Sequence, residues 1–135
     1  MARRPANSSV LKYLRLLAGM IGLADWDIAV EIKADMTSAW WATCEVPSGK
    51  SFAQIEVSPS LFKESAEEQR QVMVHELVHA HLFPLVWSWE SAVKELGPRA
   101  RKVANEVWNE RSERACDDLA RVIAPTLPLP PWKAG

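Results

Sequence analysis

The sequence predicts an α+β fold, in which a small, mostly antiparallel three-stranded sheet packs on an N-terminal helix, a central helix and a long C-terminal helix. This prediction rests on the period of the apolar residues. Apolar residues recur with helical spacing before residue 22 and again after residue 60. Between residues 26 and 57 they alternate with polar residues, as in a strand. The chain has 135 residues, 48% of them apolar, which is typical of one domain. We therefore expect residues 1–135 to form a single domain.

The N-terminal segment predicts a helix with one apolar face, for which Ser8 or Ser9 is the expected N-cap. Its apolar residues recur with helical spacing at positions 10, 11, 14, 17, 18 and 21. Lys12 and Arg15 interrupt this run, so we expect neither a signal peptide nor a membrane span, which needs about 20 apolar residues. Packing on the core is the main interpretation, and attachment of the basic face to a membrane is the alternative.

Three runs of alternating or β-branched and aromatic residues predict the strands. They are Trp26–Ile32, Ala39–Val46 and Phe52–Val57, with a turn at residues 47–50. The short connections favour antiparallel pairing. If Phe52–Val57 lies at the edge of the sheet, it could pair with an added strand.

The second half of the chain is predicted to be helical. One helix runs from Glu64 to Leu82 and ends before Pro84, and the segment 85–96 is ambiguous. A long helix follows from Arg99 to Ala124. The proline-rich tail, residues 125–135, is expected to be extended. In one interpretation the tail packs on the domain through Leu127, Leu129 and Trp132. In the other, its Pro-x-x-Pro motif binds a proline-recognising domain.

Charge and cysteine content exclude several classes of protein. Sixteen basic and 17 acidic residues give a net charge of -1, which does not favour nucleic-acid binding. Two cysteines, Cys44 and Cys116, are too few for a disulfide scaffold. With no signal peptide expected, we predict a cytoplasmic protein with reduced thiols.

Residues 75–79 read His-Glu-Leu-Val-His and match the zinc-binding motif His-Glu-x-x-His. A chain of this composition would contain the motif by chance about 0.006 times. His79 lies about 40° round the helix from His75, so both imidazoles can reach one zinc ion. Glu76 lies about 100° away, where a general base for a zinc-bound water is needed.

The rest of this predicted helix is apolar, so the arc that holds His75, Glu76 and His79 needs partners for its polar groups. A metal ion with its water would satisfy them, and the alternative is two core histidines bonded to backbone. His81 points roughly the other way, and we interpret it as structural.

The third ligand cannot be a histidine, because all three histidines lie within residues 75–81. Leu82 and Leu85 occupy the positions where the longer astacin and matrixin signature has glycine and histidine, so that class is excluded. A carboxylate or Cys116 remains. The last helix offers Glu113-Arg-Ala-Cys-Asp117, with two carboxylates one turn apart on one face.

Over roughly residues 26–125 the chain resembles compact gluzincin-type zinc metallopeptidases, and among them the ImmA/IrrE-like domains. The shared pattern is the strand at residues 54–57, the His-Glu-x-x-His helix, and a second helix that contains Glu113-Arg-Ala-Cys-Asp and ends at Pro125. The resemblance implies a minimal zincin fold in which His75, His79 and Glu113 bind zinc and Glu76 is the base. It also implies that Asp117 hydrogen-bonds a ligand histidine and fixes its tautomer. Such small proteins are common in phage and prophage genomes.

The helical wheel of the last helix allows a residue other than Glu113 to be the third metal ligand. With Val103, Val107 and Trp108 as the buried side, Glu113 faces away, unless the helix bends near residues 111–112 or its C-terminal half buries another face. Glu110 is then the substitute ligand, and a solvated acidic stripe is the interpretation without a metal.

Two functions are compatible with these residues. The first is a zinc metallopeptidase that acts on a protein or peptide, with neither nucleic acid nor a membrane as partner. The second is a zinc-stabilised interaction or structural module, of the kind that phages encode, with a vestigial active site. The intact Glu76 favours the first. The second is favoured by the lack of an evident oxyanion-stabilising residue, since the only tyrosine, Tyr13, lies in the first helix.

Overall fold

The three strands form a mixed sheet, so the prediction of a mostly antiparallel sheet is wrong. The computed structural model describes residues 3–36 and 41–132, and its strands are β1 (Asp27–Ile32), β2 (Ala42–Glu45) and β3 (Phe52–Val57). Their order is β1-β3-β2, with β1 parallel and β2 antiparallel to β3. Alternation of apolar residues carries no information on strand direction. The connection between β1 and β2 places β2 at the far edge of the sheet.

The strand positions themselves are confirmed within a few residues, except that Ala39 and Trp40 lie outside the described residues. The condition that Phe52–Val57 lies at the sheet edge is not met, because β3 pairs with both neighbours. Its side chains alternate between the buried Ala53, Ile55 and Val57 and the less buried other face. This pattern is equally typical of a central strand with one face open to solvent.

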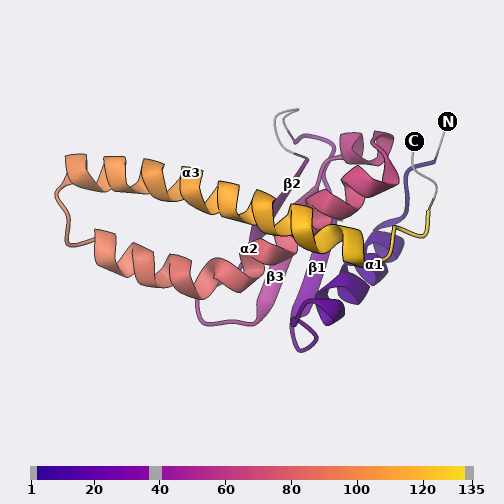
Figure 1. The fold of residues 1–135 in the computed structure, drawn as a ribbon, viewed down its shortest axis with the longest axis horizontal. Helices are drawn as coiled ribbons and strands as arrows, with labels where there is room; N and C mark the ends of the chain where they lie inside the picture. The colour runs from indigo at the N-terminus through magenta and orange to yellow at the C-terminus, as the bar shows by residue number, and fades with distance from the viewer. Residues whose placement is uncertain (1–2, 37–40, 133–135) are drawn as a thin grey trace.

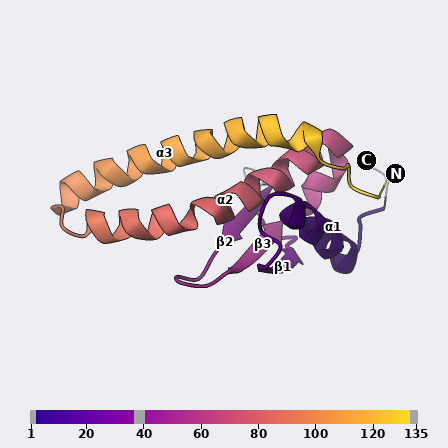
Figure 2. The same cartoon turned by 60° about the horizontal axis from the view of Figure 1, so that its bottom comes forward.

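Three long helices complete the α+β fold: α1 (Asn7–Met20), α2 (Ala66–Val93) and α3 (Pro98–Ile123). Helices α1 and α2 cover one face of the sheet, and α3 packs on the far side of α2 (Figures 1 and 2). The ends of α2 and α3 project beyond the sheet as a helical hairpin (Figure 1). Helix α2 is therefore the layer between the sheet and α3.

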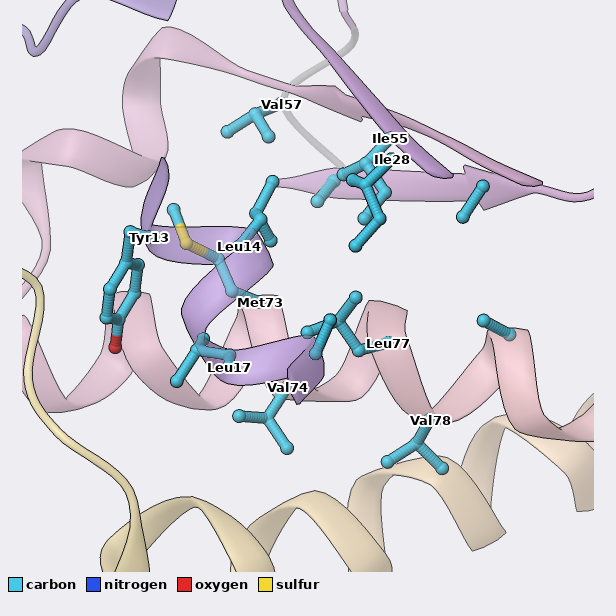
Figure 3. Packing of buried hydrophobic residues seen from close by; sticks show 14 of the residues in the cluster. Tyr13, Leu14, Leu17, Ile28, Ile55, Val57, Met73, Val74, Leu77 and Val78 are labelled. Atoms are coloured by element: carbon cyan, nitrogen blue, oxygen red, sulfur yellow. The ribbon is translucent and has the colours of Figure 1, made fainter. Parts of the chain in front are cut away.

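The core lies between the sheet and the two helices that cover it. Leu14 and Leu17 of α1 and Met73 and Leu77 of α2 lie opposite Ile55 of β3 (Figure 3). All five are almost completely buried. Burial of a large aliphatic side chain stabilises a fold by about 1.5–3 kcal/mol, so this cluster fixes the orientation of α2 relative to the sheet.

Helix α2 does not end before Pro84, as the sequence predicted, but continues to Val93. Its N-terminus is close to the predicted one, and the side chain of Ser65 caps it by accepting from the N–H of Glu68 at 3.1 Å. Pro84 removes the hydrogen bond that its own N–H would donate, and the helix changes direction in this region (Figure 1). Packing of the following turns against α3 outweighs this loss.

The hairpin of α2 and α3 is held by aromatic stacking and by a cap. The rings of Trp89 and Trp108 stack with centroids 5.0 Å apart, and Trp89 Nε1 donates to Asn105 Oδ1 at 3.1 Å. The guanidinium of Arg101 donates to the carbonyl oxygens of three residues at the end of α2, namely Val93, Lys94 and Leu96. These contacts set the register between the two helices.

The N-terminal helix begins earlier than predicted. Its N-cap is Ala6, and Ser8 and Ser9 lie inside the first turn, so neither is the cap. The helix spans residues 7–20 and buries the predicted apolar face, as Figure 3 shows for Leu14 and Leu17. None of the described helices combines the length and apolar character that a membrane-spanning segment requires.

The tail packs on the domain through two of the three predicted residues. Leu127 is buried, and Trp132 packs edge-to-face on Tyr13 and Phe62, whereas Leu129 is largely exposed. Trp132 Nε1 also donates to the buried Oε1 of Gln69 at 2.8 Å. The tail is therefore anchored along the described part, up to residue 132.

Candidate metal centre

Two imidazoles of α2 and one carboxylate of α3 meet at a single point. The Nε2 atoms of His75 and His79 are 3.0 Å apart. The two carboxylate oxygens of Glu113 lie 3.1 Å from Nε2 of His75 and 2.9 Å from Nε2 of His79. These three side chains are the one group in the described part of the chain whose donor atoms converge closely enough to hold a metal ion.

The three distances fit a tetrahedral ion. Zinc bound at about 2.0–2.1 Å requires ligand atoms about 3.3 Å apart along the edges of the tetrahedron. The observed separations of 2.9–3.1 Å are slightly shorter and need only small side-chain shifts. Three protein ligands also leave a fourth position free for water or substrate, which is the arrangement of catalytic rather than structural zinc sites.

Each imidazole also has a partner for its second nitrogen. Nδ1 of His75 lies 2.7 Å from Oδ1 of Asp117, and Nδ1 of His79 lies 3.4 Å from Sγ of Cys116. A proton on Nδ1 can be shared with these acceptors, which leaves the Nε2 lone pairs directed at the common point. Asp117 is thus where the sequence analysis expected it. The role of Cys116 was missed.

The charges around the centre favour a cation. Burial by itself would lower the pKa of His75, but the hydrogen bond to Glu113 and the charges of Glu76, Glu113 and Asp117 raise it above the usual value. The hydrogen bonds from His75 and His79 hold the pKa of Glu113 well below its usual range. A proton or a metal ion between the two Nε2 atoms would therefore be stabilised by the carboxylates.

Glu76 lies beside this group in a different environment. Its side chain is buried, and burial raises its pKa to about 7, although the nearby His75 and His79 act in the opposite direction. On β2, the pKa of the Cys44 thiol is raised mainly by burial and secondarily by the charge of Glu76. A carboxylate with a pKa near neutrality, next to a metal position, is suited to exchange protons with a bound water.

Glu113 faces the centre because α3 does not bury the side that its apolar residues suggested. Val103 and Val107 are 56% and 50% exposed, so the prediction that they mark the buried side is wrong. The less exposed side of α3 recurs every three or four residues and includes the polar Asn105 and Ser112. Its members are Asn105, Trp108, Ser112, Cys116 and Ala120. Glu113 follows Ser112 directly, whereas Glu110 is exposed and lies outside the converging group.

Cys116 is not placed as a ligand. Its sulfur faces Nδ1 of His79, the nitrogen opposite to the one that points at the centre, and it is completely buried. Burial raises the pKa of its thiol to about 12, which favours the protonated form. Glu113 and Cys116 are three residues apart and therefore lie on the same face of α3, which packs on α2. The spacing is evident in the sequence, but the contact between the Cys116 thiol and His79 is not.

The remaining histidine and the tyrosine have structural contacts. Nε2 of His81 donates to the carbonyl oxygen of Ile21 at 2.6 Å, just after α1, as expected for a structural residue. The hydroxyl of Tyr13 donates to the carbonyl oxygen of Pro128 at 2.7 Å. Both side chains are therefore engaged away from the centre.

Comparisons with protein-family models, with curated proteins and with solved structures find no match to this chain. The group of His75, His79 and Glu113 could bind a metal ion, and that statement rests on the geometry of the site itself.

Proposed function

We propose that the protein is a zinc-dependent metallopeptidase with a minimal zincin fold, of the gluzincin type that the ImmA/IrrE-like domains represent. The observation that carries the proposal is the buried Glu76 beside a ligand set of two imidazoles and one carboxylate. A purely structural ion would need no general base beside its ligands. An ionisable carboxylate is costly to bury, and this one has a use only if it acts on something bound at the centre.

When bound, zinc lowers the pKa of its water towards about 7 and polarises a substrate carbonyl. His75, His79 and Glu113 would hold the ion. Glu76 takes the proton of the attacking water and passes it to the leaving amine, for which its pKa of about 7 is suited. Asp117 and Cys116 keep the two imidazoles oriented.

The substrate backbone has a place to bind at β2 rather than at β3. Strand β2 is an edge strand, and α2 packs against it. Its Cys44 lies within the electrostatic reach of Glu76. An extended peptide that adds to β2 would therefore lie close to the general base.

The test is digestion of an unfolded protein, followed by mass spectrometry of the fragments. We expect the zinc-loaded wild type to cleave, a chelator to stop the cleavage, and Glu76→Gln to lower the rate about 10²–10⁴-fold with zinc retained. The matched control is Glu90→Gln, which changes an exposed carboxylate of the same helix. Equal cleavage by wild type and Glu76→Gln would remove Glu76 from its role.

A specific observation favours a second candidate, a zinc-stabilised interaction module. Gluzincins stabilise the oxyanion with a tyrosine or histidine, but Tyr13 and His81 are engaged elsewhere in the described structure. Loss of one oxyanion donor costs about 10²–10³-fold in rate, so the peptidase is expected to be slow. A zinc-loaded protein that cleaves nothing, yet unfolds when zinc is removed, would favour the module.

A further inference from the structure

The outward face of α1 and the segment before it carry only positive charge. Residues 1–24 contain no aspartate or glutamate. Arg3, Arg4, Lys12 and Arg15 are all exposed, and none of them is in an ion pair among the described residues. In a chain with a net charge of -1, this is a clear segregation of charge.

An apolar groove lies directly beside these cations. It has a volume of about 420 Å³, and it runs between α1 and the proline-rich tail. Leu16 and Leu129, which are 51% and 44% exposed, line it together with Tyr13 and Pro131. Ser9 and Lys12 complete the lining, so the cationic face and the groove are continuous.

The helical face next to the groove is open to an approaching backbone. Ser8 and Gly19 are exposed and carry little or no side chain. A Cβ atom placed on Gly19 would meet nothing within 4 Å. Met20, one turn after Leu16, is 53% exposed and extends the apolar stripe along the helix.

The groove is preformed, because the tail that makes its second wall is fixed. The hydroxyl of Tyr13 donates a hydrogen bond to the carbonyl oxygen of Pro128 at 2.7 Å. The guanidinium of Arg70 donates one to the carbonyl oxygen of Leu127 at 2.8 Å. Trp132 is bonded to Gln69 at 2.8 Å. A rigid wall spares a ligand the free energy of ordering it. Figure 1 shows the yellow tail passing beside the start of α1, at the end of the molecule opposite the tip of the helical hairpin.

We propose that this surface binds an acidic segment of a protein partner. An apolar side chain of that segment occupies the groove between Leu16 and Leu129, and its carboxylates face Lys12 and Arg15. A peptide fits better than a membrane, because a bilayer is entered by apolar side chains that protrude, whereas this surface is hollow at its apolar part. This binding site is separate from the metal centre and does not depend on the proposed peptidase activity.

The probe is a displayed library of random dodecapeptides, selected on the folded wild-type protein. We expect the selected peptides to combine a large apolar residue with flanking aspartate or glutamate. Synthesised, the best of them should bind at least about 10-fold more weakly to Lys12→Glu/Arg15→Glu, and more weakly at high salt. The matched control is Arg99→Glu/Lys102→Glu, which reverses two exposed charges on α3 and should leave binding unchanged.

Selection without enrichment of acidic residues would overturn the proposal, as would equal binding to Lys12→Glu/Arg15→Glu. Sedimentation of the protein with phosphatidylserine vesicles, combined with no selected peptide, would assign the surface to membranes instead. Should the charge-reversed variant fail to fold, amide chemical shifts of the wild type provide the test. Shifts on adding the peptide should then concentrate at Lys12, Leu16 and Leu129, and shifts confined to other regions would refute the assignment.

Discussion

Replacement of Glu76 by glutamine should stabilise the metal-free protein. Glu76 is buried, and burial raises its pKa from 4.5 to about 7. As the pH rises, the unfolded chain loses this proton first, so the free energy of unfolding of the wild type falls. Glutamine has nearly the same shape and stays neutral, so the variant lacks this loss.

The size of the effect follows from the two pKa values. One pKa unit corresponds to about 1.36 kcal/mol, so the full shift is worth about 3 kcal/mol. The destabilisation of the wild type is nearly absent below pH 4.5, grows through the interval to pH 7, and is constant well above it. Between pH 5 and pH 8 the difference in unfolding free energy between variant and wild type should increase by about 2–3 kcal/mol.

Urea unfolding in the presence of a chelator, measured at several pH values from 5 to 8, gives these free energies directly. Glu90→Gln on the exposed side of α2 is the control for the loss of one carboxylate from this helix. If the difference between Glu76→Gln and wild type stays constant within about 0.5 kcal/mol from pH 5 to 8, the burial argument for Glu76 is refuted.

Three further predictions concern the neighbours of the centre and the tail. Cys116→Ser should keep its zinc, because the sulfur faces Nδ1 of His79, and thiol titration of the unfolded wild type should find two free thiols; loss of zinc or a disulfide would contradict this. Asp117→Asn should weaken zinc binding about 10–100-fold in a competition titration, since Asp117 contacts Nδ1 of His75, and unchanged affinity would argue against that role. Trp132→Ala should lower the free energy of unfolding by about 3 kcal/mol, because it removes the edge-to-face contacts and leaves the buried Oε1 of Gln69 without a hydrogen-bond donor. A loss below about 0.5 kcal/mol would show that the tail is not anchored.

The local parts of the fold and site were predictable from the sequence. Apolar periodicity placed the strands and helices, and the motif at residues 75–79 located both imidazoles and Glu76, because one helical turn determines their relative positions. The step from Glu113 to Asp117 is similarly local: Glu113 lies at the centre, and Asp117 contacts Nδ1 of His75.

Features that depend on contacts between distant segments were not predictable. Strand β1 pairs in parallel with β3 rather than with the next strand in the sequence, and alternation records neither strand order nor direction. The continuation of α2 past Pro84 depends on stacking between Trp89 and Trp108. The face of α3 that meets α2 includes Asn105 and Ser112, so a wheel based on apolar residues assigned the wrong side.

The most direct test of the metal centre is the zinc content of the purified protein and of two histidine variants, measured by elemental analysis. We expect one zinc per chain in the wild type, none in His79→Ala, and an unchanged content in His81→Ala, because His81 bonds to the Ile21 carbonyl and not to the centre. Wild-type protein that binds no zinc on reconstitution, or His79→Ala that keeps it, would contradict the site assembled by His75, His79 and Glu113.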